Sequence, residues 1–600
     1  MLNSWTNILV SINANMDQSH EDSWSKALVV VALDIGTAFS GYALSFVDLY
    51  LSKSINDVQA RQWRSSAHTT GKTPTCVLCK PNKEFDSFGY DAENKFASLA
   101  DKEEHQGWYF FQNFKMRLYQ EKNLDRNIEL TDVSGTKRMP ALDVFAMSIK
   151  FLKDDALQQA HEQRTELGEM DFSWVLTVPA IWSDKSKQFM REAAEKAGIE
   201  PSHLRLALEP ECASVFCREI AIRRSTGDSG TSANFLPMES GTKYMVIDMG
   251  GGTIDVTVHE TTSTGALKEL YQASGGDWGA TKVNEAFSSF MVKMFGAQVW
   301  KEFRETCMDD FFKFTRDFEQ KKYVPPEDKV NIPMPVSLID LHRKKEGCEL
   351  EQSLAFMPFP IDASVSYRKG KLTMNAAQFK ERFFGECIKD ILDHIKKILG
   401  KVPNLKRLLL VGGFSECSLV KNAIKQEFPH HTITVPEDAA TAVLRGAILY
   451  GRNPSVIKSR ICKFTYGFDW SEEYNPMIHP RDKRIDTDDG PYCSDIFKKL
   501  VEVGQEVNVG HCSEEIETFV TYKSQERIAF PFYKSTQKSP SFVTEEGCTH
   551  IGTLYMDVPY SREGVNRSVF IQVQFGGTEI TAKVRDRTGQ KVKSARFDLL

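Results

Sequence analysis

The chain has 600 residues, of which 41% are apolar and 26% charged, a composition typical of a globular protein with about four domain-sized units. Its net charge of −6 gives no reason to expect nucleic acid or an acidic membrane as the main partner. No apolar run approaches the roughly 18 residues that span a bilayer, and twelve scattered cysteines without a signal-peptide-like start predict a cytoplasmic protein, with the nucleus as an alternative.

The first ordered element expected along the chain is a hairpin with a glycine turn, preceded by a flexible arm at residues 1–27. Residues 27–46 read ALVVVALDIGTAFSGYALSF, which predicts an apolar strand, Asp34, a turn at Gly36 and Thr37, and a second strand. A glycine turn leaves backbone N–H groups uncovered, so an anion can bind there.

Two short signals follow the first hairpin. Lys115 lies within WYFFQNFKMRLY, and its aromatic neighbours favour a packed stem with a directed ammonium group; a surface lysine on an amphipathic segment is the alternative. Cys76 and Cys79 form a single CxxC without a second pair or a helix start, which favours a strand over a metal or redox site.

A strand–helix–strand unit then leads to a glutamate. Residues 172–178 predict a strand, Ser183 is expected to cap a helix that stops at Gly198, and residues 204–208 form the next strand before Glu209. An acid between a strand end and a helix lies where α/β proteins place site residues, although a simple helix-capping role is the alternative.

The second hairpin repeats the first. Residues 243–260 read KYMVIDMGGGTIDVTVHE, with Asp248 and Asp255 flanking Gly250–Gly252 and Thr253. A strand rather than a helix follows the glycines, so the segment is not a P-loop. The acids favour a hydrated hard cation and the N–H groups a phosphate, whereas a tight hairpin without a ligand is the alternative. Two copies of this Asp-x-Gly…Thr hairpin predict two similar lobes with a cleft between them.

The second half of the lobe-forming region carries weaker signals. Residues 311–323 are expected to be helical, with Glu319 and Lys322 one turn apart; a solvated ion pair is the alternative. Residues 324–372 are expected to be irregular and rich in proline, and Asn375 should cap a long amphipathic helix.

A buried strand is expected at residues 407–414, RLLLVGGF, where Gly412, Gly413 and Phe414 precede a helix. This strand–GlyGly–helix unit brings backbone and a helix N-terminus close to a ligand. From about residue 456, short alternating segments such as RIAFPFYK and SVFIQVQFG predict a separate β domain that extends to residue 600.

These motifs, in this order, resemble the 70-kilodalton heat-shock chaperone family, which is grouped with actin and sugar kinases. DIGTAFSGYA resembles its first phosphate loop, VIDMGGGTIDVTV its second, TVPAIWSDKSKQFMREAAEKAGI with LEP its connecting segment, and LLLVGGFS its adenosine loop. SGGDWGATKVNEAF, FEQKK and FGGTEITAKVRDRTGQKV look like the divergent 12A/12B branch.

The resemblance implies an α/β, duplicated actin-like ATPase fold. Its two lobes, at about 28–240 and 241–410 with a closing segment at 411–455, would surround a nucleotide cleft and precede a β-rich domain at 456–600 without a helical lid. The resemblance also implies ATP or ADP with Mg²⁺ as cofactors, and K⁺ as a further candidate ion.

Site roles are likewise carried over from the resemblance. The implied catalytic residues are Lys115, Glu209, Asp248 and Thr253, and Asp34, Asp248 and Asp255 would hold Mg²⁺ mostly through water. The implied nucleotide contacts are Asp34, Gly36, Thr37, Ala38, Gly250, Gly251, Gly252, Gly275, Gly276, Glu319, Lys322, Tyr323, Gly412, Gly413 and Phe414.

The chain departs from the family pattern at four of these positions or their neighbours. Ala38 replaces a second hydroxyl, Leu208 replaces the asparagine before Glu-Pro, and Tyr323 and Glu416 stand where the main family has arginines beside adenine. These departures predict altered or weaker base recognition and slow hydrolysis.

Three functions are therefore weighed. The first is a weakly ATP-hydrolysing, atypical chaperone that binds protein clients through its β domain, with nucleotide exchange factors as candidate partners. The second is a nucleotide-binding scaffold or signalling protein with little or no hydrolysis. The third is a small-molecule kinase of the same superfamily, which the VPAIWSDKS connection and the β domain disfavour.

Overall fold

The computed structural model describes most of the chain. The described residues are 24, 26–47, 57–64, 69–121, 123–225, 238–323, 328–356, 365–487, 490–520, 524–558, 567–586, 592–597 and 599–600. The predicted N-terminal arm therefore lies almost wholly outside them. None of the described helices is both long and apolar enough to cross a bilayer.

The first large sheet carries the first predicted hairpin. Its strands run in the order β13-β12-β1-β2-β3, with β6 paired to β2. β1 pairs antiparallel with β2 and parallel with β12, which in turn pairs parallel with β13. The bounds are β1 Val29–Asp34, β2 Phe39–Phe46, β3 Gln59–Ala60, β6 Thr73–Pro74, β12 Phe172–Val178 and β13 Leu204–Leu208.

The second large sheet repeats this arrangement around the second hairpin, in the order β21-β20-β14-β15-β16-β22-β26. β14 pairs antiparallel with β15 and parallel with β20, and β20 pairs parallel with β21. Both sheets thus contain the same hairpin–parallel–parallel unit. The bounds are β14 Lys243–Met249, β15 Ile254–Thr261, β16 Leu267–Gly276, β20 Arg407–Val411, β21 Thr432–Thr434, β22 Ile457–Ile461 and β26 Glu506–Asn508.

Two helices, α6 (Glu209–Ser225) and α14 (Ala442–Arg452), pack between the sheets. In β1, Val30 and Ala32 face this shared core while Val29, Val31 and Leu33 face the opposite side, as expected for strands covered on both faces. Gly446 lets the helices touch, because a Cβ there would lie 1.7 Å from the carbonyl oxygen of Cys212.

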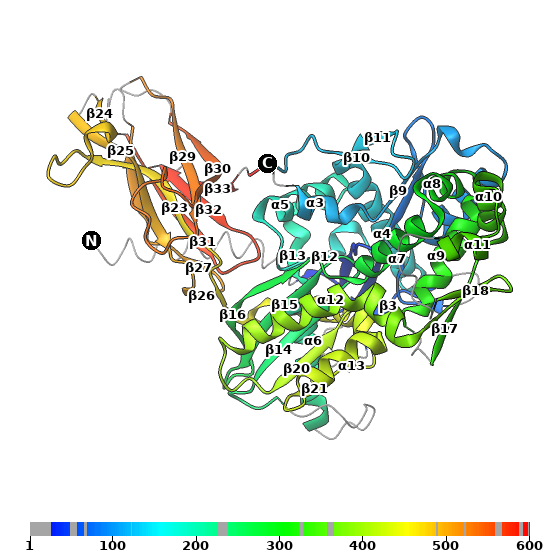
Figure 1. Ribbon diagram of the computed structural model, residues 1–600. Helices are drawn as coiled ribbons and strands as arrows, with labels where there is room; N and C mark the ends of the chain where they lie inside the picture. The colour runs from blue at the N-terminus through cyan, green and yellow to red at the C-terminus, as the bar shows by residue number, and fades with distance from the viewer. Residues whose placement is uncertain are drawn as a thin grey trace.

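Further helices cover the outer faces of the sheets (Figure 1). α4 (Ala141–Gln163) and α5 (Asp184–Lys196) cover the first sheet, and α7 (Ala280–Phe295) and α12 (Ala376–Leu399) cover the second. The predicted caps are confirmed: the Ser183 hydroxyl accepts from the Ser186 N–H, and the Asn375 side chain accepts from the Gln378 N–H.

Other helices and strands up to residue 427 surround the two large sheets and their covering helices. They include β4 Trp63–Arg64, β5 Thr69–Thr70, β7 Cys76–Cys79, β8 Phe85–Phe88, α2 Gly89–Asp101, β9 Tyr109–Gln112, η3 Phe114–Met116, α3 Arg117–Gln120, β10 Glu129–Thr131, β11 Arg138–Pro140, α8 Ala297–Thr306, α9 Met308–Lys321, η6 Gly413–Glu416 and α13 Ser418–Glu427. Cys76 and Cys79 are buried strand residues, as predicted.

The expectation of an irregular segment at 324–372 is wrong for its described part. It contains β17 Lys329–Pro333, α10 Val336–Glu346, α11 Leu350–Phe356, β18 Ser366–Arg368 and the start of β19 Lys371–Asn375. Val330 and Ile332 alternate against Leu372 and Met374 of β19. The prolines delimit these elements rather than prevent them, since Pro333 ends β17 and Pro335 caps α10.

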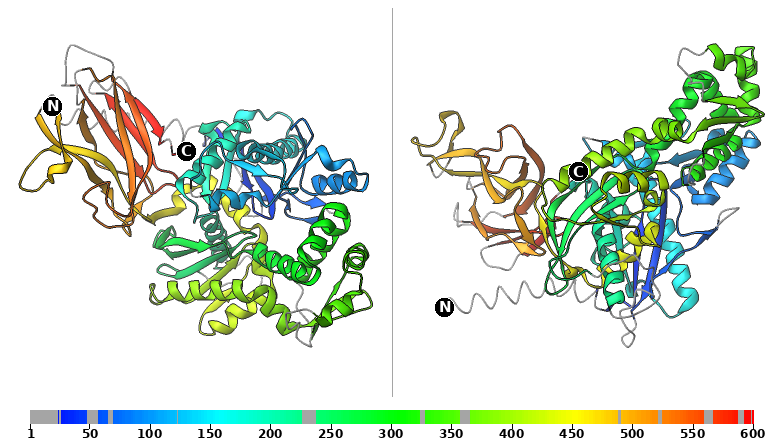
Figure 2. Two further views of the ribbon diagram at one scale, coloured as in Figure 1. Left: turned by 45° about the horizontal axis from the view of Figure 1, so that its top comes forward. Right: turned by 60° about the horizontal axis from the view of Figure 1, so that its bottom comes forward.

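The C-terminal part consists of two further five-stranded sheets that enclose one apolar core (Figure 2). One has the order β24-β25-β23-β29-β30, and the other contains β27, β31, β32 and β33 with β28 paired to β31. The bounds are β23 Thr465–Glu473, β24 Arg484–Thr487, β25 Gly490–Val501, β27 His511–Cys512, β28 Ile516–Phe519, β29 Arg527–Ser535, β30 Cys548–Asp557, β31 Ser568–Phe575, β32 Thr581–Asp586 and β33 Val592–Arg596.

The chain enters this part through strands that extend the second sheet. β22 pairs parallel with β16, and β26 pairs antiparallel with β22. Arg460 of β22 makes a bidentate ion pair with Glu211 of α6 at 2.7 Å, and Arg191 of α5 pairs with Glu579 at 2.5 Å. Both arginines are buried. The Arg191–Glu579 pair joins the C-terminal sheets to α5, and the Arg460–Glu211 pair fixes the connecting strand β22 to α6.

Candidate functional site

A cleft of about 1640 Å³ lies where the two predicted hairpins turn. Its walls include the ends of β1 and β14, the turns that follow them, η3, α9 and the start of η6. The predicted site residues that line it are Asp34, Gly36, Thr37, Ala38, Lys115, Glu209, Asp248, Gly250, Gly251, Gly252, Thr253, Glu319, Tyr323, Gly412, Gly413 and Phe414. Segments far apart in the sequence thus meet at one site.

The two glycine turns lie against each other at the floor of the cleft. A Cβ on Gly251 would lie 2.8 Å from the Cβ of Ala38, and one on Gly252 would lie 2.3 Å from the hydroxyl oxygen of Thr37. These approaches are closer than real Cβ contacts, so a side chain at either position would force its neighbours to move. Because these glycines have no side chain, the backbone N–H groups of the two turns can lie close together.

Asp34 is held as a charged carboxylate at the end of β1. One oxygen accepts a hydrogen bond from Lys72 Nζ at 2.5 Å, and the other accepts from Thr177 of β12 at 3.0 Å. Burial by itself would raise the pKa of Asp34, but the charges of Lys72 and Lys115 and these hydrogen bonds lower it.

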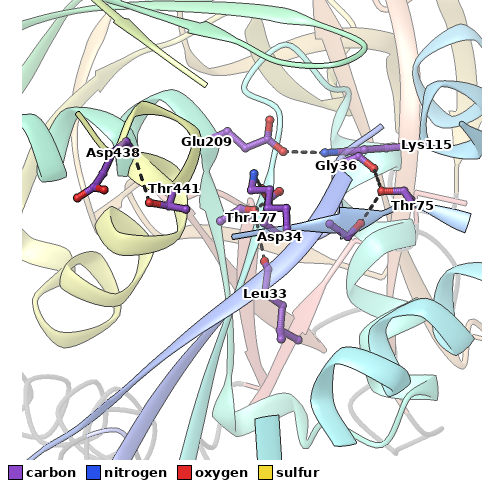
Figure 3. A network of polar contacts seen from close by, with 11 residues as sticks. Leu33, Asp34, Gly36, Thr75, Lys115, Thr177, Glu209, Asp438 and Thr441 are labelled. Atoms are coloured by element: carbon purple, nitrogen blue, oxygen red, sulfur yellow. Dashed lines mark hydrogen bonds and ion pairs between the residues drawn. The ribbon is translucent and has the colours of Figure 1, made fainter. Parts of the chain in front are cut away.

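Lys115 and Glu209 form a buried ion pair in the cleft lining, with Nζ and Oε1 2.7 Å apart (Figure 3). Lys115 lies in η3, which begins directly after Asn113, a residue in the left-handed region with a φ of 53°. The Lys115 ammonium group lies 5.3 Å from the Trp182 ring centroid. Only 3% of Lys115 is exposed, so the predicted packed stem is observed and the surface alternative is excluded. Burial raises the pKa of Glu209 to about 7, although Lys115 opposes the shift.

The acids of the second hairpin have a different environment. The pKa of Asp248 is raised well above its usual value by burial and by the charges of Glu209 and Asp255, with Lys72 opposing. Asp255 is 1% exposed and accepts a hydrogen bond from the Ile181 N–H at 3.0 Å. Asp255 is therefore sealed behind the cleft wall rather than facing the cleft.

The far end of the cleft lies between α9 and the Gly412 turn. Glu319 pairs with Lys322 at 2.8 Å and accepts a hydrogen bond from Asn284 of α7 at 2.9 Å. Lys322 is fully buried, so the alternative of a solvated pair is excluded. Gly412 has a φ of +79°, and a Cβ there would lie 2.5 Å from an oxygen of Asp248.

Four of the predicted residues do not reach the cleft surface. Gly275 and Gly276 lie in β16, paired with Asp255 and Ile254, and the neighbouring Asp277 lines the cleft. Lys322 and Asp255 stand behind the lining residues. These four residues therefore make no direct contact with the cleft in this conformation.

Known proteins resemble this chain over nearly its whole length. The family model described as "Hsp70 protein" matches residues 102–340. The chain is 33% identical over 646 residues to human "Heat shock 70 kDa protein 12B", covering 95% of this chain and 91% of that protein. It is 32% identical over 642 residues to human "Heat shock 70 kDa protein 12A", covering 98% and 94%.

This chain belongs to the Hsp70 family. Its resemblance to the 12A/12B branch is confirmed by the near full-length matches. It is also 22% identical over 328 residues to "Chaperone protein dnaK" of Cyanidium caldarium, covering 54% of this chain and 46% of that protein. The mixed α/β structure with several sheets is consistent with the actin-like ATPase fold of the family.

Sequence reasoning missed several cleft residues of this Hsp70-family chain, among them Lys72, Arg316 and Glu93. Lys72, in the turn before β6, forms an ion pair with Asp34. No sequence motif marks this lysine, because its position depends on how the strands pack. Arg316 of α9 pairs with Glu93 of α2 at 2.7 Å, and both side chains line the cleft. An arginine one turn before the predicted Glu319 was the available signal.

The family implies Mg²⁺, but the side chains present do not fit an ion bound directly at Asp34. Lys72 and Thr177 already occupy the two Asp34 oxygens, and the Ile181 N–H binds Asp255. In the described part of the chain, no three His, Cys, Asp or Glu side chains are grouped to hold a metal ion. The predicted ions held through water stay a prediction.

Proposed function

We propose that this chain binds ATP and ADP in the cleft, hydrolyses ATP slowly, and binds protein partners through its C-terminal sheets in a nucleotide-dependent way. The two hairpin sheets would be the two lobes of a duplicated actin-like fold, at about 28–240 and 241–410 with residues 411–455 closing it. Residues 456–600 would form the partner-binding domain, with β22 and β26 connecting it to the second lobe.

The buried Lys115–Glu209 pair supports this proposal most directly. Phosphoryl transfer needs mainly positioning and charge neutralisation. Glu209, whose pKa is raised to about 7, can accept a proton from an attacking water. Lys115 donates a hydrogen bond that orients the Glu209 carboxyl group, and it brings a positive charge to the phosphate end of the cleft. The N–H groups of the two touching glycine turns supply donors to phosphate oxygens.

A nucleotide-binding scaffold with little or no hydrolysis is the second candidate. The observation that favours it is the Lys72–Asp34 contact, which ties up one of the two acids expected to organise the phosphate end. Both candidates share the cleft, so binding and hydrolysis must be measured separately.

Calorimetry and single-turnover hydrolysis of wild type and Lys115→Ala test the proposal. We expect wild type to bind ATP and hydrolyse it slowly, and Lys115→Ala to retain binding within about tenfold while hydrolysis falls roughly 10²-fold. Lys80→Ala removes a surface lysine that pairs with Glu84 at 3.6 Å and serves as the matched control. Equal inactivity of wild type and variant with intact binding would support the scaffold, and no nucleotide binding at all would overturn both.

A further inference from the structure

Lys72 is held in a fixed position by its neighbours at the phosphate end of the cleft. Its Nζ lies 2.5 Å from Asp34, and 21% of its side chain is exposed to the cleft that it lines. Asp34 itself is 6% exposed, so the contact is largely shielded from bulk water. An ion pair of this kind is more persistent than an exposed pair between flexible side chains.

The strand architecture directs the lysine onto Asp34. Gly41 lies directly opposite Asp34 in the β1–β2 register, and a Cβ on Gly41 would lie 3.2 Å from Lys72 Cγ. The lack of a side chain at Gly41 thus provides the space through which the lysine stem passes.

The turn that carries Lys72 is fixed on three sides. The Thr70 hydroxyl donates to the Lys72 carbonyl oxygen at 2.7 Å, and β6 pairs with β2 immediately after the lysine. A Cβ on Gly71 would lie 2.9 Å from the Thr441 methyl group, so this turn packs against the segment before α14. The ammonium group is therefore positioned before any ligand arrives.

The surrounding charges explain why a cation is needed here. Asp34, Glu209, Asp248 and Asp255 are four buried acids, whereas Lys115 is engaged by Glu209. Without a second cation, Asp34 would be a buried carboxylate near the acids Glu209 and Asp248, an arrangement that is strongly unfavourable. An ammonium has three N–H donors, so Lys72 can keep Asp34 with one and offer the others to phosphate oxygens.

We propose that Lys72 is a tethered cation that takes the place of a divalent ion at Asp34, so that nucleotide binds with little dependence on Mg²⁺. The inference rests on the proposed nucleotide binding in the same cleft. Lys72 is a binding residue that bridges Asp34 and the phosphates, and its positive charge, rather than its size, carries the effect.

Calorimetric titration of ADP and ATP, each in excess EDTA and in millimolar Mg²⁺, tests the inference. For wild type we expect affinities in the two conditions within about threefold of each other. For Lys72→Met we expect at least roughly tenfold weaker binding in EDTA that recovers when Mg²⁺ is added, since the ion can then reach Asp34. Lys72→Arg retains the charge and should remain insensitive to Mg²⁺, as should the surface control Lys80→Met.

The outcomes separate this inference from the proposed function. Wild type that binds nucleotide only with Mg²⁺ overturns the role of Lys72 and leaves nucleotide binding standing. Equal Mg²⁺ dependence of wild type and Lys72→Met overturns it as well. Absence of binding in every condition overturns the proposed function and the inference together. Thermal unfolding checks that Lys72→Met is folded. If it is not, the wild-type titrations with and without Mg²⁺ still test the inference.

Discussion

The two glycine hairpins have equivalent strand pairing and opposite electrostatics. β1–β2 and β14–β15 occupy equivalent places in sheets of equivalent order, and each hairpin has an aspartate at or near the end of its first strand. Asp34 is ion-paired and its pKa is lowered. Asp248 forms no ion pair within the described residues, and burial beside other acids raises its pKa.

The difference shows that a repeated hairpin keeps its strand pairing in both copies but not the charge state of its aspartate. Strand pairing and turn geometry follow from the local pattern, so both copies present an aspartate to the cleft. The charge of each aspartate depends on neighbours supplied by other segments, here Lys72 for Asp34 and Glu209 for Asp248. Substitutions at paired positions of the two hairpins can therefore test geometry and charge separately.

The largest difference is expected between Gly36→Ala and Gly250→Ala, the glycines two residues after each aspartate. A Cβ on Gly36 would lie 2.1 Å from the Phe39 carbonyl oxygen, whereas one on Gly250 would lie 3.0 Å from that of Thr253. Backbone must move in the first case, so we expect Gly36→Ala to lower the free energy of unfolding by about 3 kcal/mol and Gly250→Ala by about 1 kcal/mol or less. Denaturant unfolding of both variants checks this, and equal losses would contradict the tighter fit of the first turn.

A smaller effect is expected for Asp34→Asn. The substitution leaves the Lys72 ammonium, only about a fifth exposed, without its anionic partner. Removing one member of a largely buried pair costs several kcal/mol when burial is complete, so we expect a loss of about 2 kcal/mol here. Asp154→Asn, whose pair with Lys150 is more than half exposed on both sides, should change stability by less than about 0.5 kcal/mol. Similar losses for the two variants would contradict the shielding of Asp34.

Much of this comparison was readable from sequence. The strand–turn–strand periodicity and the cap residues Ser183 and Asn375 are local signals, and the structure has them where they were predicted. Lys72 could not be found this way, because it reaches Asp34 from 38 residues away through a gap left by Gly41. The short elements in 324–372 were missed for a related reason: β17 is defined by its pairing with β19 rather than by its own composition.

The smallest expected effect is the pH dependence of Asp248→Asn, and it tests the electrostatic contrast most sharply. A raised folded-state pKa means that the folded protein holds the Asp248 proton more tightly than the unfolded chain does. Stability is therefore lost as pH rises above the unfolded value of about 4. An asparagine side chain carries no charge at any of these pH values, so Asp248→Asn should gain stability relative to wild type between pH 5 and pH 8, on the order of 1 kcal/mol.

Asp34 should behave in the opposite sense. Because its folded-state pKa is lowered, its contribution is fully present above the unfolded value and is lost only in more acidic solution. The deficit of Asp34→Asn should thus stay constant over the same range. Unfolding of wild type and both variants at pH 5, 6.5 and 8 distinguishes a flat difference for Asp34→Asn from a widening one for Asp248→Asn. Parallel pH dependences would mean that the two hairpins share one electrostatic environment, and Lys72 would then lose its assigned effect on Asp34.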